Sequence, residues 1–195
     1  MNQELFKQAM TMFNSPEKWN AFIELVSQKD NIIDQWFLKL TESAKKKFLA
    51  EDLVQGWEFK TWGTFGMKWY LKEYGENSIS LILDNGAFSL YAEPNFNNLE
   101  VIQKLLKTEI FAPLLQCFNR FDSLYQEGGK LITEDKNFSF GSPYDSKFDF
   151  DRLAWYAGNK SKDFLNQISE KVNKFRKDEK MNFLLNQLNQ EAKNK

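Results

Sequence analysis

Histidine is absent from this chain of 195 residues, and that one absence removes many catalytic mechanisms. Without an imidazole there is no Ser-His-Asp or Cys-His nucleophile, no histidine general acid or base, and no zinc site that uses histidine. The phosphate-binding patterns GxxxxGK[ST] and GxGxxG are missing as well. The sequence therefore predicts a protein that is not an enzyme and that holds no cofactor or metal.

Cysteine is nearly absent, because Cys117 is the only one. A lone cysteine cannot form an intramolecular disulfide, and the apolar neighbours of Cys117 predict a small buried side chain. No run of 18 apolar residues occurs, and the polar first residues are unlike a signal peptide. We therefore expect a soluble, cytoplasmic protein that makes no membrane contact.

Arginine is also scarce, with three residues in the whole chain, and 26 basic residues balance 27 acidic ones. Nucleic-acid binders usually have a basic excess and use arginine to contact phosphate and guanine. The balance therefore favours another protein as the partner. Nucleic acid is the alternative partner, which a local basic face would support.

Aromatic residues, in contrast, are abundant: 19 Phe, six Trp and six Tyr. Because each ring buries a large apolar area, we expect rings to fill much of the core. The first fifty residues have a helical pattern, and Ser15 and Pro16 are typical of a helix start. Apolar residues recur at helical spacing in two stripes: Trp19, Phe22, Ile23 and Val26, then Ile33, Trp36, Phe37, Leu40, Ala44 and Phe48.

Between about residues 53 and 92 the hydrophobic period changes to two, which is typical of strands. Asn85-Gly86 readily accepts the positive φ angles of a two-residue hairpin turn, and glycine-containing turns separate the earlier runs. We predict a three- to four-stranded antiparallel meander with one polar face and one face covered by helices. Residues 131–133 are a candidate short strand.

Beyond the sheet, most of the chain again has a helical pattern. The sequence therefore predicts an α+β protein with N-terminal helices, the meander, and C-terminal helices packed on one face of the sheet. A charged run at 176–180 shifts the phase of the last apolar stripe. We expect a single domain over residues 1–175 and a C-terminal helical extension over 176–195, in which residues 181–190 are a candidate for self-association.

Catalysis by a carboxylate-bound metal ion needs no histidine and so remains possible for this chain. Its pattern, an aspartate and then an acid-x-Lys triplet on a strand, is met by Asp122 with Glu134-Asp135-Lys136. A second triplet, Glu58-Phe59-Lys60, lies on a predicted strand, but Asp52 is too close to come from a different strand, and the third triplet is Glu191-Ala192-Lys193. Since chance gives about two such triplets in a chain this rich in Glu and Lys, we predict no nuclease centre.

Three strand-like runs and a late helix resemble a known family. The runs are Gly63-Thr64-Phe65-Gly66-Met67-Lys68-Trp69-Tyr70, Ile79-Ser80-Leu81-Ile82-Leu83 and Phe88-Ser89-Leu90-Tyr91-Ala92, and the helix extends from Phe164 to Phe175. Residues 63–175 thus resemble the accessory region found after the nuclease core in some bacterial PD-(D/E)XK nuclease-like proteins of unknown function. The nuclease core itself is not evident, because the chain before residue 53 is helical and too short. The resemblance implies a stand-alone partner in a defence or mobile-element system, and no catalytic residue is carried over.

These observations lead to one functional hypothesis: a non-enzymatic protein-binding module of bacterial or phage origin, such as an inhibitor, immunity protein or antitoxin in a defence or counter-defence system. The alternative is a nucleic-acid-handling accessory protein or a degenerate nuclease relative. The candidate partner-binding residues are Trp62, Phe65 and Trp69, because a turn flanked by glycines can present a ring outward. The other interpretation is that these rings seal the edge of the sheet.

Overall fold

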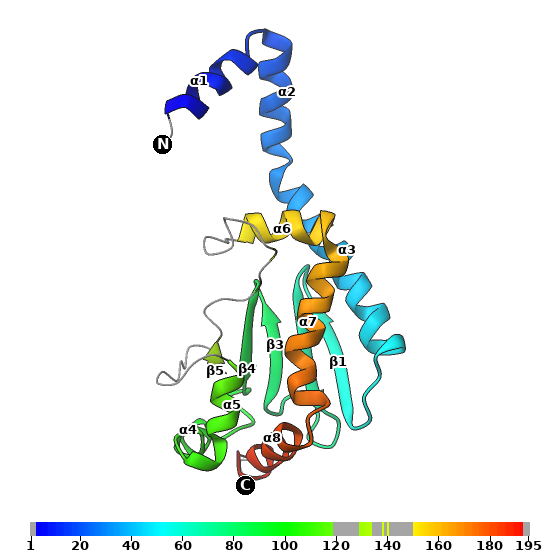
Figure 1. Cartoon of the computed structure of the whole chain (residues 1–195), viewed down its shortest axis with the longest axis vertical. Coiled ribbons are helices and arrows are strands. Elements are labelled where there is room, and N and C mark those ends of the chain that lie inside the picture. The colour runs from blue at the N-terminus through cyan, green and yellow to red at the C-terminus, as the bar shows by residue number, and fades with distance from the viewer. Residues whose placement is uncertain (1–2, 119–128, 134–137, 139, 141–149, 193–195) are drawn as a thin grey trace.

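The computed structural model describes residues 3–118, 129–133, 138, 140 and 150–192 (Figure 1). It confirms the α+β class, with N-terminal helices, an antiparallel sheet and C-terminal helices. Among the described helices, none combines the length and the apolar character needed to span a membrane.

The N-terminal part consists of four helical segments: α1 (Gln3–Met12), α2 (Pro16–Ser27), α3 (Lys29–Lys46) and one turn of π-helix, η1 (Lys47–Glu51). The predicted start of α2 is confirmed. Ser15 is extended, its hydroxyl accepts a hydrogen bond from the backbone N–H of Lys18, and Pro16 opens the first turn. α2 and α3 meet at Gln28, and helical hydrogen bonds to Glu24 and from Ile32 lie on either side of this residue.

The sheet has five antiparallel strands in chain order: β1 (Trp57–Trp62), β2 (Gly66–Leu71), β3 (Ser80–Asp84), β4 (Ala87–Tyr91) and β5 (Lys130–Thr133). The hairpin turn between β3 and β4 is confirmed, with φ of 49° at Asn85 and 81° at Gly86. The predicted meander between residues 53 and 92 is confirmed by the four strands β1 to β4, and the candidate strand at 131–133 is confirmed as β5. The short run at 130–133 pairs with β4, across an irregularity between Leu90 and Tyr91.

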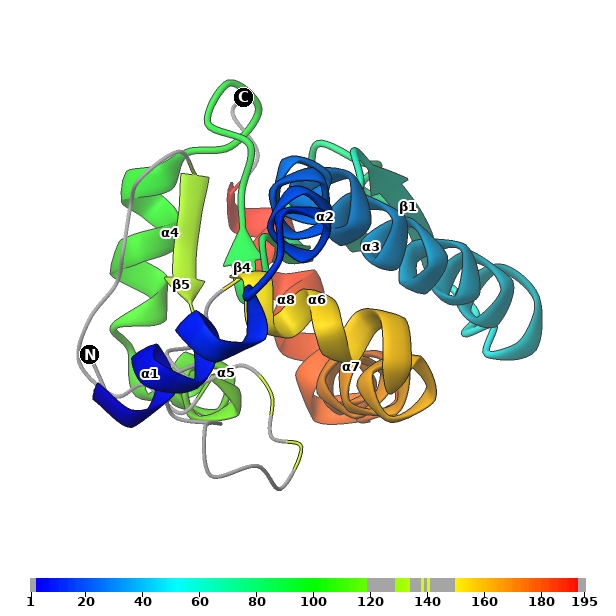
Figure 2. The same ribbon diagram turned by 90° about the horizontal axis from the view of Figure 1, so that it is seen from above.

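The remaining helical elements follow the sheet: α4 (Leu99–Leu106), η2 (Glu109–Phe111), α5 (Ala112–Cys117), α6 (Phe150–Asn159), α7 (Ser161–Arg176) and α8 (Glu179–Ala192). α7 crosses one face of the sheet, with α6 at one end and α8 at the other (Figure 1). Figure 2 shows α6, α7 and α8 together on the same side of the sheet. The predicted cover of one sheet face by C-terminal helices is thereby confirmed.

Aromatic rings fill the core between this sheet face and the helices. Register places Phe59, Trp69, Leu81 and Leu90 in one row across the inner face. Phe48 from η1 lies with its ring centroid 5.1 Å from those of both Phe59 and Trp69. Further rings enter from two helices, α3 and α7, and are all fully buried: Phe37, Phe164 and Phe175.

α8 belongs to this core, which corrects the expected extension over 176–195. Leu185 and Leu188 are fully buried, and the amide of Asn189 accepts a hydrogen bond from Ile79 N–H at 2.8 Å. The backbone N–H of Asn98 also donates to the carbonyl of Ala192. The phase shift in the apolar stripe marks the turn between α7 and α8, which directs both helices toward the core. Leu184, Leu185 and Leu188 therefore pack within the chain, whereas Phe183 is 65% exposed, and self-association through 181–190 stays a prediction.

Candidate functional site

The three predicted partner-binding residues occupy two different environments. Phe65 is 3% exposed and stacks on Phe37 with ring centroids 4.3 Å apart, and Trp69 is 1% exposed. Both rings lie in the core, so neither is available to a partner, and the expectation that they form a contact surface is corrected. The period of two places Trp69 on the inner face beside Phe59. Only Trp62, which is 41% exposed, remains accessible.

Trp62 lies on the outer face of the sheet, at the end of β1. Its register partner is Gly66, and a Cβ at that position would overlap the indole. One face of the indole therefore rests on the glycine backbone, and its exposed area belongs to the other face. The next row of the outer face pairs Lys60 with Lys68. Register thus places one aromatic ring beside two lysines.

The charges of the outer face are mostly paired. Lys60 bonds to Glu76 at 2.6 Å, and the Tyr70 hydroxyl donates to Glu58 at 2.8 Å. Burial and this hydrogen bond raise the pKa of Tyr70 to about 12, so its hydroxyl stays protonated. Lys68 makes no ion pair with a described residue, and its ammonium lies 5.2 Å from the ring centroid of Tyr91. Burial lowers the pKa of Lys68, although nearby carboxylates oppose that effect.

The carboxylate–lysine patterns do not assemble a metal centre in the described structure. Glu58 and Lys60 bond to Tyr70 and Glu76, as above, and Asp52 instead faces α7. Asp122 and the triplet at 134–136 lie outside the described residues. Within the described ranges, no three acidic or cysteine side chains are arranged to hold a metal ion.

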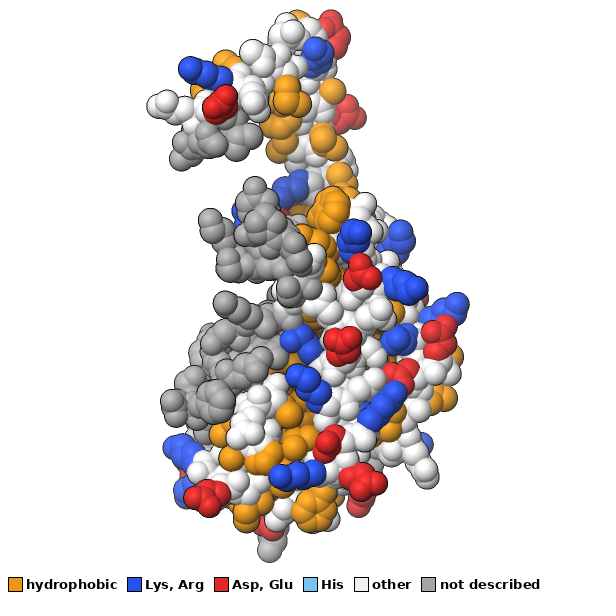
Figure 3. Space-filling model, viewed as in Figure 1, with side chains coloured by type: hydrophobic (Ala, Val, Ile, Leu, Met, Phe, Trp, Pro, Cys, Tyr) orange, Lys and Arg blue, Asp and Glu red, His pale blue; other side chains and the backbone are white. Residues whose placement is uncertain are grey.

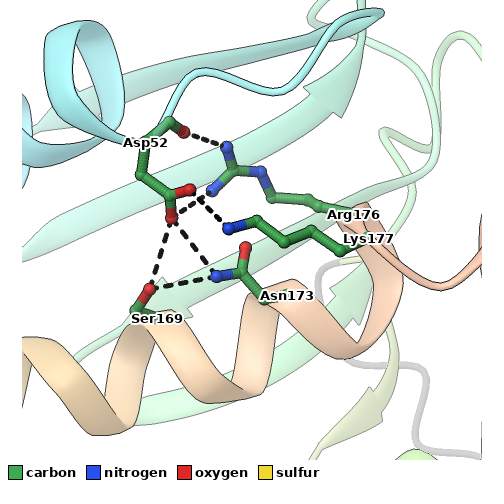
Figure 4. Close-up of polar contacts among 5 residues, drawn as sticks. All are labelled: Asp52, Ser169, Asn173, Arg176 and Lys177. Atoms are coloured by element: carbon green, nitrogen blue, oxygen red, sulfur yellow. Dashed lines mark hydrogen bonds and ion pairs between the residues drawn. The ribbon is translucent and has the colours of Figure 1, made fainter.

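A polar cluster around Asp52 fastens the end of η1 to α7 (Figure 4). The carboxylate of Asp52 accepts hydrogen bonds from Asn173 at 3.2 Å and Ser169 at 3.4 Å, and it pairs with Lys177 at 2.7 Å. Arg176 donates to the Asp52 carbonyl at 2.5 Å, while its guanidinium lies 5.2 Å from the ring centroid of Phe48. We call these five residues, drawn together in Figure 4, the Asp52 cluster.

The electrostatics of the Asp52 cluster indicate a structural role. Partial burial alone would raise the pKa of Asp52, but the hydrogen bonds and charges of Lys177, Asn173 and Arg176 outweigh burial and lower it. Desolvation lowers the pKa of Arg176, and the charge of Asp52 opposes that change. A carboxylate held by this many donors is a poor general base. The cluster therefore fixes the position of η1 against α7.

Two surface hollows lie elsewhere on the C-terminal helices. One of about 380 Å³ lies at the junction of α7 and α8, where Lys177, Asp178 and Glu179 place both signs of charge at its wall. Another of about 300 Å³ is lined by residues that include Tyr156, Lys160 and Asp163. Small-molecule sites are concave, mostly apolar and have convergent polar groups. The mixed charges of both hollows are unlike such a site.

A surface rich in exposed apolar side chains lies at the N-terminus. We call residues 3–27, which contain α1 and α2, the arm. The arm projects from one end of the sheet-and-helix body (Figure 1). None of the 12 residues of α2, all of which are described, is buried. The space-filling view shows hydrophobic side chains along the arm (Figure 3).

The exposed side chains of the arm include large apolar residues. Trp19, Ile23 and Val26, which we call the arm stripe, are each about half exposed. Their spacing of four and then three residues continues through Asp30 to Ile33, Phe37 and Leu40. The α3 part of this series is buried, because Phe37 and Leu40 are fully enclosed by the core. One heptad-like series thus has a buried half and an exposed half.

Contacts within the arm join its two helices at the tip. The ring of Phe13 lies 4.4 Å from that of Phe22 and 5.9 Å from that of Trp19, measured between centroids. Ile23 and Val26 are not part of this ring cluster, and both remain about half exposed. Phe6, Met10 and Met12 of α1 are also more than half exposed.

Comparison with family models, with curated proteins and with solved structures gave no match. The function must therefore be inferred from the surfaces of this chain alone. Sequence reasoning identified the helical stripe at Trp19, Ile23 and Val26 but did not identify it as a surface. Spacing gives the face of a helix, and only the tertiary arrangement tells whether another element covers that face.

Proposed function

We propose that this protein is a non-enzymatic protein-binding module and that the arm is its docking element. The observation that carries the proposal is α2, a helix without one buried residue. Its stripe of Trp19, Ile23 and Val26 is half exposed to solvent. Exposed apolar patches of more than a few hundred Å² are typical of interaction sites.

The stability of short helices supports this role. Isolated helices of fewer than about 12–15 residues are marginal in water, and most helices in proteins are stabilised by packing of an apolar face. α1 has 10 residues and α2 has 12. Burying each large side chain of the arm stripe on a partner would contribute on the order of 1 kcal/mol, since half of its area is already covered. The arm therefore gains stability when it is bound.

The size and chemistry of the arm indicate the kind of partner. Seven large apolar side chains of the arm are about half exposed or more: Phe6, Met10, Met12, Trp19, Ile23, Leu25 and Val26. At on the order of 100 Å² each, their exposed area is comparable with the roughly 800 Å² that one partner contributes to a standard interface. The arm stripe carries no charge. It is suited to a protein that presents an apolar groove or helix face.

The roles expected from the sequence, inhibitor, immunity protein or antitoxin, each need one exposed surface that covers a target protein. The arm has the area for this task, and the body of the protein holds it away from the sheet (Figure 1). Our proposal therefore keeps protein binding and moves the contact from the turn at 63–66 to the arm.

The test compares three forms of the full chain in affinity capture from the native host. One is unchanged, one carries Ile23→Asp and Val26→Asp, and one carries Ile110→Asp, which alters an isoleucine on η2 that is 60% exposed, against 49% for Ile23. We expect a protein that binds the unchanged chain and the Ile110 variant directly after purification but does not bind the arm variant. Equal binding of that protein to all three forms would exclude the arm as the docking element.

A second candidate function, binding of single-stranded nucleic acid, is favoured by one observation. Trp62 lies flat on Gly66 beside Lys60 and Lys68, and such proteins combine stacked bases with basic side chains. The test is the affinity of a labelled single-stranded oligonucleotide at low salt. This candidate predicts that added salt weakens binding and that Trp62→Ala weakens it about tenfold or more. An absence of binding at low salt would eliminate it.

A further inference from the structure

We propose that α1 is a movable cover for the arm stripe: it closes on α2 as an antiparallel helical hairpin and so competes with the partner. This inference rests on the proposed function of the arm and names the regulation of that site. The structure shows the open form, in which α1 and α2 diverge from their shared tip (Figure 1). Closure keeps both helices and changes only the connection between them.

α1 carries an apolar stripe with the same spacing as the arm stripe. Phe6, Met10 and Phe13 follow one another after four and then three residues, which places them on one helix face. Phe13 continues the helical turn, because its backbone N–H donates to the carbonyl of Ala9. Phe6 and Met10 are more than half exposed. Each helix of the arm therefore has an uncovered apolar face that matches the other in length.

The ring contacts at the tip set the register of the closed hairpin. Phe13 contacts both Trp19 and Phe22, so in an antiparallel pair it lies level with the middle of the two, at about position 20 to 21. Met10 precedes Phe13 by three residues and therefore lies level with about position 23 to 24. Closure thus brings Met10 onto Ile23 without breaking the contacts that already exist.

Phe6 completes the closed face. It precedes Phe13 by seven residues and lies level with about position 27, beside Val26. Closure therefore covers the two residues of the arm stripe that lie outside the ring cluster. Met12 and Leu25 are about 120° around their helices from the two stripes, so both stay exposed in the closed form.

The connection between the helices is suited to closure. Only Phe13, Asn14 and Ser15 lie between α1 and α2, and antiparallel helix pairs are typically joined by two to five residues. Because the two helices already meet at the tip, closing them adds little loop entropy. The hydroxyl of Ser15 caps α2 from within the connection, and closure leaves that cap in place.

The closed arm is weaker than the packing of a body helix, and this weakness makes it a switch. α1 has 10 residues, α2 has 12, and each would be covered along one side only. The closed arm therefore opens often, and its amides exchange faster than those of α3. A partner that covers the arm stripe displaces α1, and the fraction of open arm sets the apparent affinity.

Disulfide trapping tests closure in the full chain. Met10→Cys and Ile23→Cys are combined with Cys117→Ser, which removes the one native thiol. The closed hairpin brings the two Cβ atoms to the roughly 4 Å that a disulfide needs. The control pair is Met12→Cys with Ile23→Cys, which has a shorter connection but places one thiol on the wrong face. At low protein concentration, the Met10 pair should form its intramolecular disulfide about tenfold faster or more.

Equal rates for the two pairs would overturn closure, because the short connection alone would then explain both. A measurement without engineered cysteines gives a second test. Met10→Asp should speed exchange of the α2 amides about threefold or more, since it removes the cover of Ile23, whereas Met12→Asp should leave that exchange unchanged. Equal exchange of α2 in these two variants would also overturn the proposal.

Trapping also separates closure from the docking function. A host protein that binds through Ile23 and Val26 should bind the oxidised Met10 pair about tenfold less tightly or worse, and reduction should restore its binding. Fast trapping in a chain whose Ile23→Asp and Val26→Asp variant loses no binding would support closure and overturn docking. Equal trapping rates in a chain whose arm variant does lose binding would overturn closure and leave the docking arm intact.

Discussion

α2 and α3 share one hydrophobic series but differ in what covers it. In α3, Phe37 and Leu40 are fully buried against the sheet and the C-terminal helices, whereas in α2 Ile23 and Val26 are half exposed. The two helices have the same spacing and similar residues. The comparison teaches that an amphipathic stripe specifies a helix and its apolar face, while the rest of the fold decides whether that face belongs to the core or to an interface.

The largest expected effect is on the buried side of this comparison. Phe37→Ala should lower the free energy of unfolding by about 3–5 kcal/mol, because it leaves a cavity among Phe65 and Phe150, whose rings stack on Phe37. Urea denaturation followed by circular dichroism measures the change. A loss below about 1 kcal/mol would show that α3 is covered no better than α2.

The Asp52 cluster holds η1, and with it the end of α3, against α7. Among the described contacts, no such polar cluster joins the arm to the body. Asp52→Ala should destabilise the protein by roughly 3 kcal/mol at neutral pH, since it leaves the buried guanidinium of Arg176 without its carboxylate. The exposed Glu51, which lies 3.7 Å from Lys46, is the control, and Glu51→Ala should cost less than about 0.5 kcal/mol.

The same cluster makes a prediction about pH. The pKa of Asp52 is lowered in the folded protein. Its contribution is therefore fully present above the unfolded carboxyl pKa of about 3.9 and is lost as pH falls through the folded value. Urea midpoints measured from neutral to acidic pH should show a constant gap between wild type and Asp52→Asn down to about pH 4, then a shrinking one. A gap that grows in acid would contradict this account.

A matched pair of substitutions sharpens the comparison within the series itself. Ile33→Ala in α3 should cost about 2–3 kcal/mol, because Ile33 is buried. Ile23→Ala in α2 should cost less than about 1 kcal/mol in the purified chain, because Ile23 is half exposed. Urea denaturation of both variants measures the two costs. Equal costs would argue against an exposed stripe.

The smallest expected effect concerns the outer face of the sheet. Gly66→Ala should displace the indole of Trp62, because the new Cβ would occupy its place. The stability cost should stay below about 1 kcal/mol, since Trp62 is exposed and free to move. A change in tryptophan fluorescence that disappears in a Trp62→Phe background is the measurement. Unchanged fluorescence would mean that Trp62 does not rest on Gly66.

Much of this fold could be predicted because local signals and tertiary structure agree. Asn85-Gly86 forms the expected turn, and Ser15 caps α2, since both depend on the chemistry of neighbouring residues. The strand at 131–133 was a candidate from the sequence, but its pairing with β4 and the packing of α8 depend on contacts distant in sequence, such as Asn189 with Ile79. Those contacts have no local signature.

The candidate site was harder to predict for the same reason. Phe65 lies in a turn between Gly63 and Gly66, and such a turn is equally suitable for a ring that points outward or inward. Its stacking on Phe37 is a tertiary contact. The arm stripe looks like any core stripe in the sequence, because exposure depends on what lies beyond the helix. A heptad-like series from Trp19 to Leu40, with Asp30 as its one charged position, was the available signal. This series is longer than the part that α3 buries in the core, so its N-terminal half was a candidate for an exposed apolar face.

Amide hydrogen exchange of α2 and α3, measured together in the purified chain, tests the central claim most directly. We predict that α3 is protected and that Pro16–Ser27, where no residue is buried, exchanges much faster. Protection of α2 that equals that of α3 would contradict the account, because the arm would then be stable without a partner.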